Sequence, residues 1–334
     1  MTPPEGRRST VSVVIPCRDE LTALPRLVEA LRRQSLQPDE VVVADGMSTD
    51  GTRQVLADLA ASDPRVVVVD NPDRTVPAAM NVLLARATGD YVARMDTHAE
   101  YAPDYLEAVV GVLDRDPGAV AVGSAMATAG RGRWGRAIAA VLGRRIGLGG
   151  ASHRVGGAAG PVPHVFSGCY RRSAVLEAGG WDERLRANED FEADQRVGRL
   201  GRILLEPSAT STWYVREAPR ALAVQMWRYG FYKALTLRLH PDSLKVRQLA
   251  PPAVVAGLLA TTAVRPRAGL GLLAAYLAVA GAAGARAASA DGADAWRGAV
   301  VPPVVHLSWG AGLLAGTVRF AGVRRRGGAA EDGS

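Results

Sequence analysis

Val11-Ser12-Val13-Val14-Ile15-Pro16 is the stretch that decides the fold of this 334-residue chain. So continuous a run of β-branched, apolar residues predicts a strand that is buried on both faces. The turn that follows, Cys17-Arg18-Asp19-Glu20, contains no glycine. A dinucleotide-binding fold would need glycines there, because backbone amides must approach a pyrophosphate closely. The sequence therefore argues against an NAD-dependent oxidoreductase and favours a metal ion as the group that neutralises phosphate.

Strand and helix patterns alternate along the first third of the chain. Further strands are predicted at residues 40–44, 65–69, 91–95 and 119–123, with helices at residues 21–34, 51–61, 76–87 and 103–115. This alternation predicts a mostly parallel α/β sheet with right-handed crossovers. Ligands of such sheets bind beyond the carboxyl ends of the strands.

Residues 126–165 are rich in glycine and arginine and show no strong period, although residues 137–142 could form a short helix. Two interpretations stay open, a mobile basic loop that receives a phosphorylated acceptor and a solvated surface excursion. His153 and His164 in or near it are given no role. A compact α+β pattern returns at Val165, and residues 217–239 have the pattern of an amphipathic helix or helix pair.

Composition limits the partners. The formal net charge is +7, and a basic protein can meet nucleic acid, an anionic membrane or phosphorylated substrates. The arginines are dispersed and aromatic residues do not interleave with them, which argues against nucleic acid. Cys17 and Cys169 are the only cysteines, so the chain has no disulfide framework, and both are expected to pack in the core.

The C-terminal part is unusually apolar. Three nearly uncharged segments lie at residues 249–264, 268–285 and 299–322. A membrane span needs about 20 apolar residues, a length that the second and third segments approach or reach. Two spans would keep the arginines at 265–267 and 324–326 on the inner side, whereas three would place both clusters outside. We therefore expect a two-span hairpin with the first segment in the interface; packed soluble helices are the alternative.

The predicted domain organisation follows from these patterns. A catalytic domain is expected at residues 11–240, with a nucleotide-binding half (11–125) and an acceptor half (126–240). A membrane-associated helical region is expected at residues 241–326, and disordered ends at residues 1–10 and 327–334. Residues 1–10 lack the apolar core of a signal peptide, so we expect the catalytic domain on the cytoplasmic side of the cell membrane.

Three acidic positions carry the predicted chemistry. Asp45 and Asp96 each lie where a predicted strand ends, so one carboxylate can accept from a nucleoside and the other can hold a divalent cation on a diphosphate. Asp190 comes much later and can take a proton from a hydroxyl. Helix capping is the alternative for residues 48–50 and 188–190. The set points to sugar transfer from a nucleotide diphosphate.

Several motifs occur in a fixed order along the chain. They are Val13–Pro16 with Glu20, Asp45–Thr52, Asn81 with Gly89–Val92, Asp96-Thr97-His98, Glu189-Asp190 and Gln225–Tyr229. This ordered set, over about residues 11–235, resembles the large inverting family-2 glycosyltransferases with a GT-A fold. The apolar tail and residues 94–98 resemble in particular the succinoglycan-type members, which extend lipid-linked sugars in exopolysaccharide assembly.

The resemblance implies roles for matching residues. The nucleotide-binding set would be Pro16, Arg18, Glu20, Asp45, Ser48 and Asp96, with Asp45 facing the base and Asp96 reaching the ribose and the metal-bound diphosphate. His98 stands where the family has a second metal-binding aspartate. Imidazole suits Mn²⁺ better than Mg²⁺, which prefers oxygen, and His98 could instead donate to phosphate or simply pack. Asp190 would be the general base, with Glu189 orienting it or contacting the acceptor.

The acceptor side is implied by two further segments. Residues 225–229 resemble the QxxRW signature of processive members, with tyrosine in the final place. On a helix, Gln225, Arg228 and Tyr229 share one face, where they could meet the diphosphate and an acceptor sugar, or form an aromatic belt beside the membrane. The tyrosine and the short tail favour the addition of a single sugar. Trp181 could stack on an acceptor sugar or belong to the core.

The resemblance therefore implies an enzyme, an inverting glycosyltransferase assisted by Mn²⁺ or Mg²⁺. Its donor would be a nucleotide-sugar, UDP-linked by expectation, and its acceptor a saccharide on a polyprenyl diphosphate. One alternative is a polyprenyl-phosphate sugar synthase. The other is a non-catalytic, membrane-anchored protein that binds sugar nucleotides or polysaccharide.

Overall fold

The computed structural model describes residues 8–148 and 157–323. The chain divides into two compact units, which are described separately. The first holds Met1–Arg131 and Leu142–Val215, and the second holds Gly132–Val141 and Arg216–Ser334. His153, the arginines at 324–326 and most of the two ends that were expected to be disordered lie outside the described residues.

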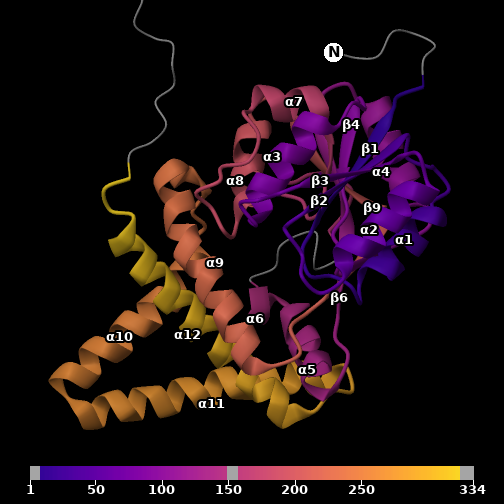
Figure 1. Cartoon of the computed structure of the whole chain (residues 1–334). Helices are drawn as coiled ribbons and strands as arrows, with labels where there is room; N and C mark the ends of the chain where they lie inside the picture. The colour runs from indigo at the N-terminus through magenta and orange to yellow at the C-terminus, as the bar shows by residue number, and fades with distance from the viewer. Residues whose placement is uncertain (1–7, 149–156, 324–334) are drawn as a thin grey trace, which may run out of the picture. The chain divides into compact units, whose positions relative to one another are not determined.

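The first unit is built on one mixed sheet (Figure 1). Its strands are β1 (Val11–Cys17), β2 (Glu40–Asp45), β3 (Val66–Asp70), β4 (Tyr91–Arg94), β5 (Ala99–Tyr101), β6 (Ala119–Ala129), β7 (Gly160–Pro161), β8 (Cys169–Arg171) and β9 (Arg202–Tyr214). They lie in the order β3-β2-β1-β4-β8-β6-β9-β5, with β7 paired to β9. Because β1 is parallel to both β2 and β4, and β2 to β3, the carboxyl ends of these four strands meet at one edge.

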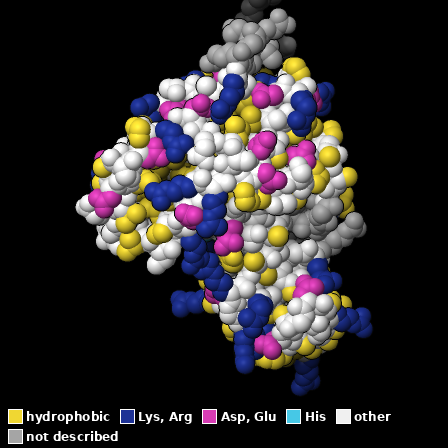
Figure 2. Space-filling view, turned by 90° about the vertical axis from the view of Figure 1, so that its right-hand side faces the viewer, with side chains coloured by type: hydrophobic (Ala, Val, Ile, Leu, Met, Phe, Trp, Pro, Cys, Tyr) yellow, Lys and Arg dark blue, Asp and Glu magenta, His cyan; other side chains and the backbone are white. Residues whose placement is uncertain are grey.

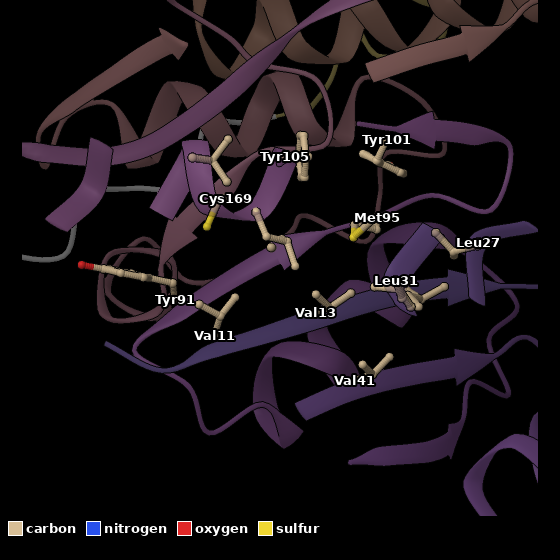
Figure 3. Packing of buried hydrophobic residues seen from close by; sticks show 14 of the residues in the cluster. Val11, Val13, Leu27, Leu31, Val41, Tyr91, Met95, Tyr101, Tyr105 and Cys169 are labelled. Carbon is tan, nitrogen blue, oxygen red and sulfur yellow. The ribbon is translucent and has the colours of Figure 1, made fainter. Parts of the chain in front are cut away.

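Helices cover both faces of this sheet. The helices of this unit are α1 (Leu24–Arg32), α2 (Thr52–Ser62), α3 (Val76–Arg86), α4 (Tyr105–Arg115), α7 (Arg172–Glu177) and α8 (Glu189–Val197), with the four-residue α6 (Arg145–Leu148) away from the sheet (Figure 1). Strand β1 shows how the core is split: Val13 and Ile15 pack with α1 and α4, whereas Val14 packs with α3 (Figure 3 shows the first of these cores). Each fully buried side chain of this size contributes about 1.5–3 kcal/mol. The predicted α/β fold with a mostly parallel sheet is confirmed.

The segment 126–165 was expected to lack strong regularity apart from a short helix at residues 137–142; its first described part is more regular than that, whereas residues 157–165 hold only the two-residue strand β7. Strand β6 continues to Ala129, and helix α5 spans Arg133–Leu142. Ile138, Val141 and Leu142 on this helix are buried. Their helical spacing explains why the segment folds regularly, although arginine and glycine dominate its composition.

The second unit is helical. It contains α5, α9 (Pro219–Leu239), α10 (Ala250–Val264), α11 (Pro266–Ala290) and α12 (Ala295–Arg319), with short 3₁₀ turns at Pro241–Ser243 and Val246–Leu249. Helices α9 and α12 pack backbone to backbone. A Cβ added at Gly312 would lie 2.2 Å from the carbonyl oxygen of Trp227, and one at Gly230 would lie 2.0 Å from that of Trp309. Only glycine permits such an approach.

Two of the described helices are long and apolar enough to cross a membrane. Helices α11 and α12 have 25 residues each, and each contains an 18-residue stretch whose mean hydropathy is 1.7 in α11 and 1.4 in α12. Helix α10 has 15 residues and so rises about 22 Å, which is short of the hydrocarbon thickness. Length and composition thus agree with two candidate spans.

Candidate active site

Two of the three predicted carboxylates lie at the edge where parallel strands end. Asp45 is the last residue of β2, and Asp96 follows two residues after the end of β4. Strand β1 lies between β2 and β4, so these strands are two spacings, roughly 10 Å, apart. Ligands of α/β sheets bind where the strand order reverses in this way.

Asp45 is fully buried and paired. Its Oδ2 lies 3.0 Å from Nη1 of Arg53, whose other terminal nitrogen lies 2.6 Å from Oδ1 of Asp70. The backbone N–H of Ser48 also donates to Oδ1 of Asp45, at 3.2 Å. Arg53 therefore fixes Asp45 at the strand end. The Arg53 side chain is half exposed, so its positive charge also faces solvent.

The two turns at this edge are bonded to each other. The backbone N–H of Asp19 donates to the Ser48 hydroxyl at 2.9 Å, and that of Thr49 donates to the Asp19 carboxylate at 2.8 Å. The backbone N–H of Glu20 donates to the Thr52 hydroxyl at 2.8 Å. Side-chain bonds thus brace the glycine-free first turn.

Of the remaining residues of the predicted nucleotide set, Pro16 lies near the end of β1, and Arg18 and Glu20 lie on the turn that follows. Arg18 is exposed, and Pro16 and Glu20 are partly buried. Asp50 next to the set accepts from the backbone N–H of Thr52 at 3.0 Å and from its hydroxyl at 2.6 Å, although the N-cap position of α2 is Gly51.

Arg94 forms ion pairs with both Asp96 and Asp190, the predicted base. Its Nε lies 2.9 Å from Oδ1 of Asp96, and its Nη1 lies 2.5 Å from Oδ1 of Asp190. The same Nη1 lies 3.8 Å from Oε1 of Glu189. Carboxylates that are almost a hundred residues apart in the sequence are therefore brought to one guanidinium. Asp190 makes its bond to Arg94 and not to a helix N–H, and Asn188 makes no side-chain cap.

The electrostatics of this cluster follow from burial and from the single positive charge. Burial and the neighbouring charge of Asp190 raise the pKa of Glu189 to about 7. Burial also raises the pKa of Asp190, although Arg94 opposes this. At Asp96 burial acts in the same direction, but Arg94 and His98 outweigh it and lower the pKa. Three carboxylates around one guanidinium carry two excess negative charges when all are ionised, which suits a divalent cation.

Asp96 is held from three directions. Its Oδ2 accepts from the hydroxyl of Ser167 at 3.0 Å, and its backbone N–H donates to the Tyr101 oxygen at 2.7 Å. The hydroxyl of Tyr105 donates to the carbonyl of Ser167 at 2.5 Å, which fixes that residue in the left-handed region at φ 45°. Strain of this kind persists only where the surroundings impose it, and it is typical of functional sites.

A second buried carboxylate, Asp194, ties helix α8 to the segment that carries Ser167. It accepts from Nδ1 of His164 at 2.7 Å, from the backbone N–H of Val165 at 3.1 Å and from the hydroxyl of Tyr170 at 3.0 Å. Asp194 lies one helical turn after Asp190. The segment 164–167 is therefore anchored near the base at one end and on Asp96 at the other.

The residues that could hold a divalent cation are Asp96 and His98. Asp96 is ionised, as its lowered pKa shows, and His98 is exposed two residues later, close enough to lower that pKa. Among the residues that the structure describes, no three or more His, Cys, Asp or Glu side chains are grouped to hold a metal ion. The pair therefore fits a cation whose other ligands come from a bound diphosphate.

The predicted acceptor residues have different surroundings. Trp181 is 4% exposed and packs edge-on against Tyr170 at 6.3 Å, so it is a core residue and offers no face to a sugar. On α9, the side-chain amide of Gln225 donates to the Tyr229 hydroxyl at 3.2 Å, and Arg228 is exposed. These α9 residues belong to the second unit, whereas the carboxylate cluster belongs to the first.

Sequence reasoning missed Arg94, Ser167 and Asp194. A signal existed for Arg94, because a charged residue in the buried strand Tyr91-Val92-Ala93-Arg94 must have a partner. The sequence signal for Asp194 was weaker, since Asp194 is simply an acidic residue one turn after Asp190 on the same predicted helix. Nothing in the sequence pairs Ser167 with Asp96.

Comparison with known proteins agrees with this architecture. The family model described as Glycosyl transferase family 2 matches residues 12–175. The Succinoglycan biosynthesis protein ExoA of Rhizobium meliloti is 35% identical over 319 residues, which cover 90% of this chain and 93% of that protein. The Pre-mycofactocin glycosyltransferase of Mycobacterium tuberculosis is 30% identical over 262 residues, which cover 77% of this chain and 54% of that protein.

Solved structures show the same fold. The mannosyltransferase PcManGT from Pyrobaculum calidifontis, in complex with GDP-Man and Mn²⁺, aligns with a TM-score of 0.61 at 20% identity, over 91% of this chain and 88% of its own. GalNAc-T7 with UDP, GalNAc and Mn²⁺ aligns with a TM-score of 0.52 at 17% identity, over 72% of this chain and 52% of its own. The resemblance predicted from the ordered motifs is confirmed: the chain belongs to glycosyltransferase family 2 and is a transferase enzyme, similar to a succinoglycan biosynthesis protein over nearly its whole length.

Proposed function

We propose that the enzyme transfers one sugar, with inversion, from a nucleotide-diphosphate donor to a lipid-linked saccharide in exopolysaccharide or cell-envelope glycan synthesis. The observation that carries the proposal is the bridge made by Arg94. It holds Asp96, at the strand edge where the donor diphosphate would bind, next to Asp190, the candidate base. A donor and an acceptor hydroxyl can then meet between them.

The chemistry follows from the two sides of Asp190. Its Oδ1 is bonded to Arg94, whereas Oδ2 is left for an incoming hydroxyl, and the side chain is 22% exposed. Asp190 takes the proton as the acceptor oxygen forms a bond to the anomeric carbon. The bond from that carbon to the diphosphate breaks on the opposite face, and its electron pair leaves with the diphosphate. A single displacement of this kind inverts the anomeric centre.

Asp96 and His98 would hold Mn²⁺ or Mg²⁺ against the donor diphosphate. When bound, the cation neutralises the negative charge that develops on the leaving group. The two structural neighbours solved with Mn²⁺ support this assignment. Asp45, paired with Arg53, would bind the nucleoside two strands away.

The acceptor assignment is supported by the second unit. Helices α11 and α12 would anchor the chain in the cell membrane with the catalytic unit on the cytoplasmic side. Membrane anchoring raises the local concentration of a lipid-linked acceptor. Arg228, exposed on α9 with Gln225 and Tyr229 beside it, would contact the acceptor's diphosphate.

A donor screen tests the proposal. Membranes that contain the full chain would be given radiolabelled UDP-, GDP- and dTDP-sugars, with and without chelator, and label would be counted in the lipid extract. We expect one donor to label a lipid-linked saccharide, and chelator to stop the reaction. Label on bare polyprenyl phosphate would instead indicate a polyprenyl-phosphate sugar synthase. Transfer that continues in excess chelator would refute the role of the cation.

Replacement of the base provides the sharper test. Asp190→Asn should lower the transfer rate by about 10²–10⁴ and leave donor binding intact. Asp182→Asn is a matched control, because Asp182 is also paired with an arginine, Arg184, at 2.5 Å and is buried in the same unit. Equal activity of the two variants would refute the assignment of Asp190.

A further inference from the structure

Both carboxylate oxygens of Asp96 already have a partner, and one of these partners is the cation Arg94. Its side chain is 9% exposed and that of Asp96 is 4% exposed, so solvent scarcely reaches the carboxylate. One oxygen of Asp96 accepts from Arg94 at 2.9 Å, and the other accepts from Ser167 at 3.0 Å. A metal ion at Asp96 would therefore have to share a carboxylate oxygen with one of these partners or displace it.

The two partners differ in charge. The hydroxyl of Ser167 is neutral and can stay beside a metal-bound carboxylate. Burial alone would lower the pKa of the Arg94 guanidinium, but the charges of Asp190, Asp96 and Glu189 outweigh it and raise that pKa, so the group stays positive. Two cations that share one carboxylate repel each other, and the repulsion is strongest where water is excluded.

We infer that Arg94 is an internal counter-cation that competes with the divalent ion for Asp96, so that the free enzyme binds the ion weakly and takes it up together with the donor. This rests on the proposed function, in which Asp96 serves a metal-bound diphosphate. The diphosphate adds negative charge and so offsets the repulsion between the two cations. Arg94 keeps its second anchor, the bond to Asp190, which holds the base in place during the exchange.

A binding titration without donor tests the competition directly. The full-length chain in detergent would be titrated with Mn²⁺ alone, with the ion that remains free measured by its EPR signal. Arg94→Met should bind Mn²⁺ at least about tenfold more tightly than the parent chain, because one positive charge beside the carboxylate is gone. Arg94→Lys keeps the charge and should bind like the parent. Adding Asp96→Asn to Arg94→Met should remove the gain.

Arg184→Met is the matched control, since it also leaves a buried aspartate, Asp182, without its arginine partner, but in a different cluster. Its affinity for Mn²⁺ should not change. If Arg94→Met does not fold, as judged by circular dichroism, Arg94→Gln provides the same loss of charge with a polar side chain.

The outcomes separate this inference from the proposed function. Unchanged or weaker Mn²⁺ binding by the folded Arg94→Met or Arg94→Gln variant would overturn the competition, even if transfer by the parent chain is sensitive to chelator. A gain that survives Asp96→Asn would also overturn it, because the ion would then sit elsewhere. A donor screen without any transfer would count against the proposed function alone.

Discussion

Glu189 shows what burial does to an acidic side chain in this site. It is 13% exposed, lies beside Asp190, and has a pKa of about 7 instead of the ordinary 4.5. Between these two values the folded chain holds a proton that the unfolded chain has lost. The contribution of Glu189 to stability therefore falls as pH rises from about 4.5 to 7, and the full penalty is present above 7.

Glu189→Gln should for this reason stabilise the first unit in a pH-dependent way. The gain at pH 8 should reach up to about 3 kcal/mol, and it should nearly vanish below pH 4.5, where the glutamate is protonated in both states. Thermal midpoints of the parent and the variant at pH 4 and pH 8 measure this difference. A variant that is equally stabilised at both pH values would contradict the raised pKa.

The rate of transfer should depend on pH through Asp190. Burial raises the pKa of this carboxyl, and Arg94 offsets only part of the effect. Asp190 therefore takes up a proton at a higher pH than an ordinary aspartate does. The rate should fall by up to about tenfold per pH unit on the acid side of its pKa. Initial rates from pH 5 to 9 test this, and the residual rate of Asp190→Asn should lack the same dependence. A flat profile for the parent would argue against a raised pKa.

At the level of residues, the sequence predicts the acidic side chains of the site better than it predicts the residues that pair with them. Asp45, Asp96 and Asp190 could be found because each has a position in an ordered motif. The bond between Arg94 and Asp190 could not, because it depends on how α8 packs against β4. Trp181 illustrates the converse, since its acceptor and core roles are equally compatible with sequence and only burial decides between them.

Among the elements, helix α8 and the segment 164–167 form one mechanical connection between the base and Asp96. Asp194 is the link, with three donors on a single buried carboxylate. Since buried donors without acceptors are costly, this link holds the segment firmly to the helix.

Asp194→Ala should lower the free energy of unfolding by about 3 kcal/mol, because the Val165 N–H and the Tyr170 hydroxyl lose their acceptor. Tyr170→Phe removes one donor together with its need for a partner and should cost less than half as much. Denaturant melts of the purified chain measure both. Equal losses would show that Asp194 acts through something other than these bonds.

The elements themselves followed the sequence wherever apolar periodicity was strong. The strands and helices expected up to residue 123 are found, most of them to within a few residues, because their apolar patterns are strong; the three-residue strand β5 was not predicted. In the described part of residues 126–148 only a short helix at 137–142 was anticipated, since glycine and arginine obscure the full length of β6 and α5. The antiparallel β8, with three residues, is too short to leave a pattern.

For the whole molecule, two-span topology is a prediction that thiol labelling can test. Cys17 and Cys169 are buried, and burial together with nearby acidic groups raises the pKa of the Cys17 thiol to about 12, so neither should react in the folded chain. With the catalytic unit inside, a membrane-impermeant maleimide should label Ser289→Cys in intact cells. It should label Ala268→Cys only after permeabilisation. The reverse pattern, or equal labelling of both, would refute this topology.

Charge over the whole molecule is mixed as well as positive. Lysine and arginine side chains are scattered over the face shown in Figure 2, with acidic side chains between them. The net charge of +7 thus acts as a diffuse attraction towards anionic surfaces, screened over about 10 Å at 0.1 M salt.

The glycine contacts between α9 and α12 fix the position of one helix along the other. With carbonyl oxygens pressed against Gly230, Gly312 and Gly316, neither helix can slide past the other by a turn. If α12 crosses the bilayer, Arg228 on α9 stays at a constant height relative to the hydrocarbon boundary. Its exposed guanidinium would then meet a lipid-borne phosphate group at one fixed depth.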